Sequence, residues 1–421
     1  MRFPRLTALL LVLLLPSPGA RAAGDQLWQG WTPDLFEKAK SESRFVILDL
    51  EAVWCHWCHV MERETYADPK VIELLQSRYL PVRVDQDASP ELAARYGDWG
   101  WPATIVFAPD GTEIVKRRGY IPAPMMAALL QAIIDDPSPG PSVLEQPEIV
   151  PAAAAALPPE RGKALDEAFR AAFDSEHGGW GDAHRFIPTD SMDLALTFAA
   201  GGDKQAEAMA RKTLDGALAL IDPVWGGVYQ YSDKADWSSP HFEKIMWYQA
   251  QTMRQYALAS RQLGEPSYLA AAQAIRSYLE RFLLTPEGAF YTSQDADLDA
   301  ATPAKVYYAL DDAGRRALGL PRIDMSLYAR ETAWAASGLV AATNISGDAT
   351  ALTLAERAMG WVMANRSLAE GGYVHGAVDR GGPFLGDSVA AGQAALDLYG
   401  ATGSRDWLMR AVAAGNFIGW T

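Results

Sequence analysis

The chain reads Trp54-Cys55-His56-Trp57-Cys58-His59, separated by three residues from the preceding apolar stretch, Arg44 to Leu50. These are the only two cysteines of the 421 residues, so any thiol chemistry takes place here. Two cysteines separated by two residues, between a strand-like run and an amphipathic stretch, are typical of a reversible disulfide at the start of a helix. The stretch therefore predicts an α/β domain with a redox-active pair.

The position of each cysteine predicts its role. A thiolate at a helix N-terminus is stabilised by the helix dipole and by unpaired backbone N–H groups, which lowers its pKa. We expect Cys55 to be the attacking thiol, and Cys58, one turn further and less accessible, to resolve the mixed disulfide. His56 can add a positive charge between the sulfurs. Asp49, six residues before Cys55, is either a proton relay to Cys58 or a polar residue at a strand end.

The same letters allow two other interpretations. Cys55 to His59 satisfies the attachment pattern for c-type haem, with His59 as the axial ligand. Zinc could bind Cys55, Cys58, His56 and His59, but four ligands within five residues cannot all reach one tetrahedral ion from a helix start. A haem domain is usually helical, whereas this motif follows a buried strand. We therefore expect no metal and no other cofactor.

The N-terminus indicates export. Arg2 and Arg5 precede an apolar run, and Ala20-Arg21-Ala22 offers small residues where a signal peptidase cuts. We expect a signal peptide over residues 1–22, cleaved after Ala22, and a periplasmic or secreted protein. No other stretch reaches about 18 uninterrupted apolar residues, so we expect no stable membrane anchor.

Charge excludes one class of partner. The chain has 52 acidic and 37 basic residues, a formal net charge of −15. Such a charge repels the phosphates of nucleic acids. We expect no nucleic-acid partner, and a length sufficient for two domains.

Residues 23–136 have the pattern of a small α/β domain. Asp68-Pro69 predicts a helix start and Asp110-Gly111 a hairpin turn. Apolar runs predict strands at 44–50, 79–84, 103–107 and 112–116, and helices are expected at 69–78 and 124–134.

A linker and a helical domain follow. Residues 137–160 are rich in proline and alanine and predict a linker, after which 161–421 have helical periodicity without convincing strand pairs. Gly-aromatic turns recur at 178–181, 226–229, 287–291 and 371–375. Each follows one of the helices expected at 161–174, 189–200, 203–221, 241–263, 267–284, 326–345, 348–366, 387–401 and 404–419. Repeated helical hairpins of this kind indicate an all-α (α/α) toroid.

The first domain resembles the thioredoxin superfamily, in which Trp-Cys-x-x-Cys ends a strand and a cis-proline opens a later strand facing the cysteines. Pro102 follows Trp101 and precedes the strand at 103–107. The resemblance implies that Pro102 belongs to the site, with Trp54, Trp57 and Trp101 beside the substrate. The partners would be protein thiols or disulfides, or a redox partner protein.

Residues 54–64, Trp-Cys-His-Trp-Cys-His-Val-Met-Glu-Arg-Glu, also resemble the signature of the spermatogenesis-associated protein 20-like family. Further matches occur in the family's order at 178–186, 240–244 and 291–297. This resemblance implies a thioredoxin-like domain fused to a toroid of the six-hairpin glycosidase type.

Toroids of that type include sugar epimerases and glycosidases, which use carboxylates and histidines in a central cleft. Two principal hypotheses follow: an exported thiol–disulfide oxidoreductase whose toroid binds a partner, or a sugar epimerase-like toroid with an accessory thioredoxin-like domain. A third is a binding protein with vestigial cysteines. The candidate sugar-binding residues, which could equally be turn and cap residues, are His184, His241, Glu243, Asp295, Asp297 and His375.

Overall fold

The computed structural model describes residues 27–144, 158–181, 184–378 and 381–420. The predicted signal peptide and residues 145–157 of the predicted linker lie outside this part. Contacts divide the chain into two compact units. The first takes in the chain up to Asp49, His59–Arg83 and Ala103–Glu145, and the second joins Leu50–Cys58 and Val84–Pro102 to the chain from Gln146 onward. The cysteine motif therefore belongs to the same unit as the helical region, by which we mean the described residues from 158 onward.

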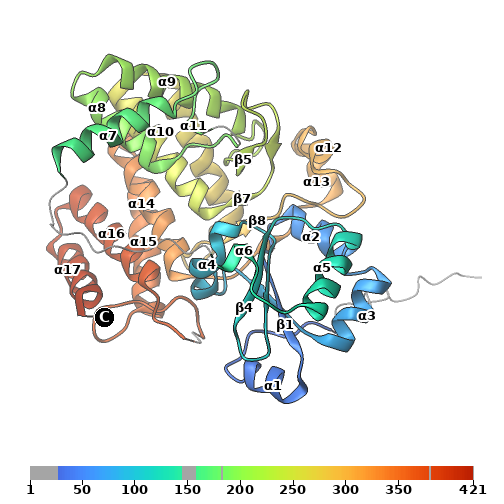
Figure 1. The fold of residues 1–421 in the computed structure, drawn as a ribbon. Helices are drawn as coiled ribbons and strands as arrows, with labels where there is room; N and C mark the ends of the chain where they lie inside the picture. Colours follow the sequence, from blue (N-terminus) through green and yellow to red (C-terminus); the bar gives the residue numbers. More distant parts are fainter. Residues whose placement is uncertain (1–26, 145–157, 182–183, 379–380, 421) are drawn as a thin grey trace, which may run out of the picture. The chain divides into compact units, whose positions relative to one another are not determined.

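A four-stranded sheet with the order β2-β1-β3-β4 forms from the predicted strands (Figure 1). β4 pairs antiparallel with β3, and Val106 lies opposite Val115. The ends differ from the predicted ones by a residue or two. The strands are β1 (Phe45–Glu51), β2 (Tyr79–Asp85), β3 (Ala103–Phe107) and β4 (Glu113–Arg118).

Helix α3 (Pro69–Arg78) begins as predicted, because the Asp68 side chain accepts hydrogen bonds from the N–H groups of Lys70 and Val71 at 2.9 and 3.2 Å. The sequence did not predict α1, α4 or α6, which are short. α6 lies in the segment predicted as a linker. The other helices of this part are α1 (Leu35–Glu42), α2 (His56–Glu64), α4 (Pro90–Tyr96), α5 (Ala123–Asp135) and α6 (Pro141–Leu144).

The core of the first unit forms where α3 and α5 cover the sheet. Both helices carry apolar residues four positions apart, which places them on one face. The sheet contributes residues of each of its strands, among them the adjacent Ile114 and Val115 of β4. Fully or almost fully buried members of this core are Ile47, Val71, Leu75, Val106, Val115, Met126 and Leu130.

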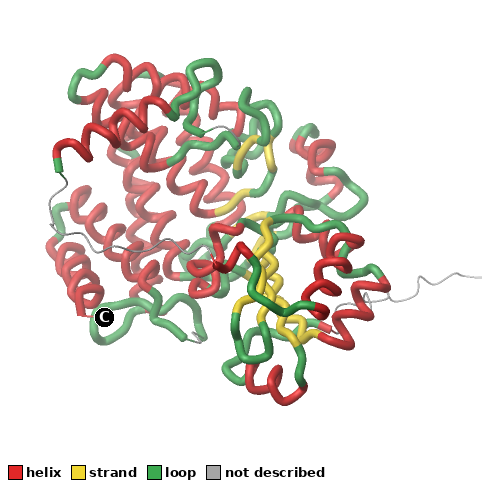
Figure 2. The backbone as a smooth tube through the Cα atoms, in the orientation of Figure 1, coloured by secondary structure: helices red, strands yellow, loops and turns green. Residues whose placement is uncertain are grey.

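The helical region consists of paired helices (Figures 1 and 2). α8, α10, α14 and α16 lie beside one another in that order, and each packs against the helix that follows it, α9, α11, α15 and α17. All nine predicted helices form. They are α7 (Pro159–Ala171), α8 (Thr189–Ala200), α9 (Lys204–Ala217), α10 (Met246–Leu263), α11 (Pro266–Tyr278), α14 (Ala329–Ser346), α15 (Ala349–Arg366), α16 (Leu385–Thr402) and α17 (Arg405–Trp420), with the short α12 (Ala304–Tyr308) and α13 (Asp312–Leu318) besides.

The Gly-aromatic turns are one structural device repeated. In the second of them, Asp222 donates its N–H to Gly227 O and accepts the N–H of Gly226, both at 3.0 Å. Gly226 has φ +76°, and a Cβ there would overlap the carbonyl oxygen of Ala274. The first turn repeats the pair of bonds between Asp174 and residues 178–179. Because each turn leads from one hairpin to the next, the sequence repeat is also a repeat of helical hairpins.

The helical region does contain strands, which corrects the prediction. Two-residue strands pair as β5 with β6 and as β7-β8-β9. Two residues are too few to leave an alternating pattern in the sequence. These strands lie in the connections that carry the candidate acids and histidines. They are β5 (Tyr231–Ser232), β6 (Pro240–His241), β7 (Lys244–Ile245), β8 (Ser293–Gln294) and β9 (Ile323–Asp324).

Among the described residues, no helix is both long enough and apolar enough to cross a membrane.

Candidate redox site

Cys55 and Cys58 are joined in a disulfide at the start of α2. Cys55 immediately precedes the helix, and its Sγ accepts a hydrogen bond from the backbone N–H of Cys58 at 3.1 Å. The sulfur thus takes the position that a serine or aspartate oxygen takes at a capped helix. On reduction, the same N–H group and the helix dipole would stabilise a thiolate on Cys55.

Both cysteines are buried, with exposed fractions of 3% for Cys55 and 4% for Cys58. The expectation that Cys58 is the less accessible of the two therefore does not hold in this oxidised state. Within the second unit, Ile245 and Tyr248 of the helical region pack against the pair, together with Trp54. Ile245 and Tyr248 are about 190 positions away from the cysteines in sequence. The motif alone therefore could not predict that they bury the disulfide.

The three tryptophans near the motif have different environments. Trp54 is buried, its Nε1 donates to Asp87 Oδ2 at 2.8 Å, and its ring meets that of Trp101 edge-on. The bond between Trp101 and Pro102 is cis. Trp57 is 41% exposed. Of the three, Trp57 therefore presents the largest fraction of its surface to a substrate.

Asp49 is buried on β1 in the first unit, with its Oδ2 3.3 Å from Arg83 Nε. Burial raises the pKa of this carboxyl to about 6, against the opposing effect of Arg83. A carboxyl with this pKa exchanges its proton near neutral pH, as a relay requires.

Two acids of the helical region contact the cysteine motif within the second unit. The backbone N–H of His56 donates to Glu243 Oε1 at 3.4 Å, and His56 Nδ1 lies 2.8 Å from Asp297 Oδ2. Pairing of β7 with β8 brings the segments of these acids together, since Lys244 lies opposite Gln294. The buried Asp295 accepts the N–H of Asp297 at 2.9 Å and so fixes the turn that presents it.

His241 continues this cluster. Its Nε2 lies 2.7 Å from Asp233 Oδ2, its Nδ1 lies 3.8 Å from Glu243 Oε2, and its ring stacks on Tyr231. Burial disfavours the charged imidazole, but the two carboxylates outweigh it and raise the pKa of His241. The ring of the exposed His184 also packs against the ring of Tyr231. The Nε2 atom of His184 lies 3.7 Å from Asp233 Oδ1. Asp233 was not predicted as a site residue, because no motif or spacing in the sequence marks it.

A pocket of about 260 Å³ lies beside the motif in the second unit. Apolar groups form much of its wall, and its polar groups are a carboxylate, two imidazoles and an amine. Its lining residues are His56, Trp57, Pro240, His241, Phe242, Glu243, Ala296, Pro303, Ala304 and Lys305. The pocket unites four predicted residues, His56, Trp57, His241 and Glu243, and adds Lys305, which the sequence did not single out.

His375 does not line this pocket. It is buried, with Nδ1 2.9 Å from Asp387 Oδ1 and Nε2 2.7 Å from the backbone oxygen of Asp87. A carbonyl oxygen can only accept, so Nε2 carries a proton. Burial opposes the charge on this ring, but Asp387 and Glu331 raise the pKa of His375. His375 thus links Asp87, the residue that bonds the Trp54 side chain, to the helical region. This is a structural role.

Three aspartates of the second unit form an acidic cluster that resembles a cation site. Carboxylate oxygens of Asp85, Asp87 and Asp324 lie within 4.8 Å of one another. Burial raises the pKa of Asp85 to about 6 and that of Asp87 well above its usual range. Their oxygens already accept hydrogen bonds from Val53, Trp54 and other donors of the second unit. These internal hydrogen bonds account for the cluster, so we do not assign a metal ion to it.

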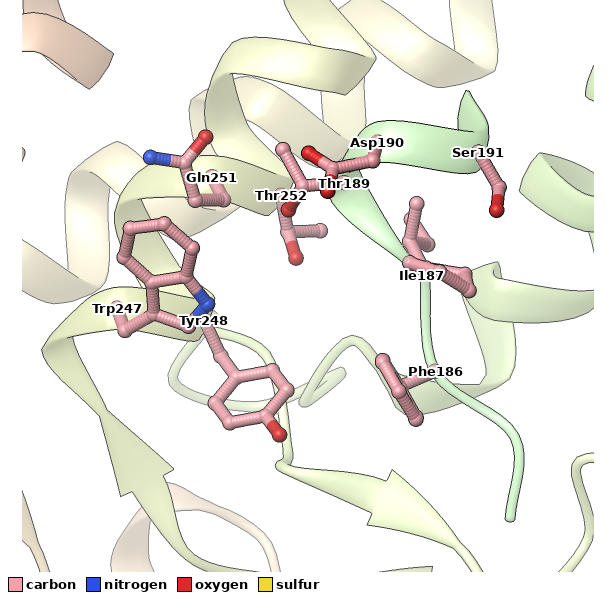
Figure 3. A pocket seen from close by; sticks show the side chains of 10 residues that line it. Phe186, Ile187, Thr189, Asp190, Ser191, Trp247, Tyr248, Gln251 and Thr252 are labelled. Atoms are coloured by element: carbon pink, nitrogen blue, oxygen red, sulfur yellow. The ribbon is translucent and has the colours of Figure 1, made fainter. Parts of the chain in front are cut away.

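A second pocket, of about 360 Å³, lies where α8 and α10 begin (Figure 3). The ring of Trp247, 38% exposed, stands on one side, with Tyr248 below it and Phe186 facing Tyr248 (Figure 3). Polar groups complete the wall: Thr189, Asp190, Ser191, Gln251 and Thr252. Tyr248 lines this pocket and also packs against the cysteine cluster.

Parts of the chain are similar to known proteins. Residues 21–134 match the family model described as "Thioredox_DsbH: Protein of unknown function, DUF255". Human spermatogenesis-associated protein 20 is 28% identical over 306 residues, which cover 64% of this chain and 39% of the human protein. The predicted resemblance to that family is confirmed. An uncharacterized protein of Caenorhabditis elegans is 26% identical over 306 residues, 64% of this chain and 41% of its own length.

This chain spans about two fifths of the curated relatives that it matches at such length. A shorter match joins 83 residues, 19% of this chain, to 14% of the thiol:disulfide interchange protein DsbD 2 of Pseudomonas aeruginosa, at 41% identity. With the observed sheet and the repeated hairpins, these findings confirm the fold class: a thioredoxin-like α/β domain followed by an (α/α) toroid.

Two solved structures align with part of this chain at low identity. Cellobiose 2-epimerase from Bacillus thermoamylovorans aligns with a TM-score of 0.48 and 11% identity, over 61% of this chain and 70% of the epimerase. A family 76 α-mannanase from Bacteroides thetaiotaomicron aligns with a TM-score of 0.45 and 15% identity, over 62% of this chain and 68% of the mannanase.

Proposed function

We propose that the chain is a thiol–disulfide oxidoreductase that works outside the cytoplasm, with Cys55 and Cys58 as its redox pair. The observation that carries the proposal is the bond from the Cys58 N–H to the Cys55 sulfur at the start of α2. This geometry favours a thiolate on Cys55, the species that attacks a disulfide. The similarity to the interchange protein of Pseudomonas aeruginosa, which falls on 83 residues, also supports it.

The exchange proceeds in two steps. The Cys55 thiolate attacks one sulfur of a substrate disulfide, forms a mixed disulfide and releases the other substrate sulfur as a thiolate. Cys58 then attacks Cys55, which closes the disulfide and releases the second substrate sulfur. The substrate gains two electrons, the pair loses two, and a dithiol partner protein must reduce the pair again.

A stable mixed disulfide should form on Cys58→Ala. This variant keeps the attacking thiol but cannot resolve the adduct, so reduced protein incubated with a protein disulfide should retain one covalently bound substrate molecule. Wild type should release it, and Cys55→Ala, the matched control, should form little adduct. Intact-mass spectrometry before and after dithiothreitol measures all three. Equal adducts on both single variants would contradict the assignment of Cys55 as the attacking thiol.

A second function, carbohydrate binding by the toroid, is favoured by the pocket at the start of α8 and α10. Its tryptophan and tyrosine offer apolar faces of the kind that stack on sugar rings, and its hydroxyl, amide and carboxylate groups match sugar hydroxyls. We propose binding there without turnover, because the acids Glu243 and Asp297 engage the cysteine motif.

Trp247→Ala should weaken binding of a sugar at least about tenfold, because removing a stacked aromatic ring costs roughly 1–2 kcal/mol. Titration calorimetry with a panel of mono- and disaccharides on the full chain measures this, with Trp361→Ala, on helix α15 and outside the lining, as the control. Isomerisation and hydrolysis assays on the same panel should show no turnover. Activity that survives Cys55→Ser but is lost in Glu243→Gln would instead make the toroid an enzyme.

A further inference from the structure

Glu243 is a buried acid of the helical region, and one of its two carboxylate oxygens has no hydrogen bond within the described part of the chain. It is 3% exposed, and its Oε2 has no hydrogen-bond partner among the described residues. Its Oε1 accepts the N–H of His56, one of the few unpaired N–H groups at the start of α2. The Cys55 sulfur accepts the N–H of Cys58, which also donates to the backbone oxygen of Cys55 at 3.1 Å. A carboxylate and a thiol therefore share the positive end of one helix.

Two acids at one helix end cannot both be ionised cheaply, since like charges repel and burial disfavours each of them. After reduction, a negative charge on Glu243 therefore opposes a negative charge on Cys55, so the two groups are coupled. Other charged and titratable groups face Glu243 from the elements around it, and their charges act on this pair. They are His56, Asp297, His241, Asp233, Tyr231, Tyr248 and, across the pocket, Lys305.

We propose that Glu243, contributed by the helical region, is the acid–base partner of the Cys55 thiol. The inference rests on the proposed redox function and assigns it a residue outside the thioredoxin-like domain. Glu243 removes the proton from Cys55 and carries it while the thiolate attacks the substrate disulfide. The bond between the substrate sulfurs breaks, and the leaving thiolate takes this proton from Glu243. The products are the mixed disulfide on Cys55, a neutral substrate thiol and an ionised Glu243.

The test uses the full chain with Cys58→Ala, in which Cys55 is the only thiol. Glu243→Gln in this background should lower the pH midpoint of Cys55 alkylation by about one unit, because a competing negative charge is gone. It should also slow the reaction with oxidised 2-mercaptoethanol about tenfold or more, because the alkyl thiolate must be protonated as it leaves. The reaction with 5,5′-dithiobis(2-nitrobenzoate), whose acidic leaving thiol needs no proton, should be nearly unchanged.

Two further variants separate this role from a structural one. Glu243→Asp keeps the carboxyl and should restore part of the rate and part of the midpoint. Glu280→Gln, which removes an acid paired with Arg276 on another part of the helical region, should change neither. An unchanged alkylation midpoint, or equal slowing with both disulfides, would overturn the role of Glu243. A parent protein that reacts with neither disulfide would refute the proposed function, while the alkylation midpoint would still test the coupling.

Discussion

Replacing Asp222 with asparagine is expected to lower the free energy of unfolding by about 3–5 kcal/mol. The carboxylate lies at the second Gly-aromatic turn and bonds Lys244 Nζ and Arg315 Nη1, both at 2.7 Å. All three side chains are fully buried. The asparagine has the same shape but no charge, so two buried cations would remain without an anion. A loss of this size is a large part of the roughly 5–15 kcal/mol that stabilises a typical protein.

Urea unfolding of the full chain, followed by tryptophan fluorescence, measures the effect. Lys244→Met in the same chain removes one of the two cations, so the double variant should recover part of the loss. Asp203→Asn, at the N-cap of α9, is the matched control and should change stability far less, because asparagine caps a helix about as well as aspartate. A loss below about 1 kcal/mol in Asp222→Asn would show that the cluster is not a main determinant of stability.

The pH dependence of the free energy of unfolding at acid pH gives an independent check of the role of Asp222. Burial alone would raise the pKa of Asp222, but Lys244 and Arg315 outweigh it and bring the pKa to about 2. Since the folded pKa lies below the unfolded one, this group's contribution is complete above about pH 4 and is lost as the pH falls towards 2. Asp222→Asn should flatten that part of the curve.

Replacing Asp49 with asparagine should slow resolution of the mixed disulfide on the order of 10²-fold near neutral pH, if Asp49 accepts the proton of Cys58. Attack by Cys55 on the substrate should be much less affected. Rapid mixing of reduced protein with a fluorescent disulfide separates the two steps. Glu62→Gln is the matched control, because Glu62 also pairs with Arg83, at 3.0 Å, but lies on the exposed side. Equal slowing in both variants would contradict a relay through Asp49.

The same variant should be more stable than wild type above about pH 6. The pKa of Asp49 is raised to about 6, so between about pH 4 and 6 the folded state binds more protons than the unfolded state. Its ionisation therefore costs stability as the pH rises through this window, by up to about 3 kcal/mol. Asparagine avoids this cost, so the gain should be present at about pH 8 and absent at about pH 4. An acid in a position that costs stability is typical of a functional residue.

Local patterns were sufficient to predict the strands of the four-stranded sheet and the longer helices. Asp68-Pro69 predicted the start of α3, and the Gly-aromatic turns predicted the helical hairpins, because capping and turn geometry depend on residues a few positions apart. The two-residue strands β5 to β9 left no such signal, and neither did Asp233. Their positions depend on pairings across tens of residues, such as Tyr231 with His241.

By itself, the sequence determined the position of the cysteine pair, the helix that begins at it and the order of the two domains, since each follows from spacing within a short segment. Only the tertiary structure decided what surrounds the pair. It packed Ile245 and Tyr248 into one apolar cluster with the cysteines, and it brought Glu243 to the N–H of His56 and Asp297 to the His56 ring. These contacts join residues about 190 to 240 positions apart, and they arise from the packing of the whole second unit, which no local pattern encodes.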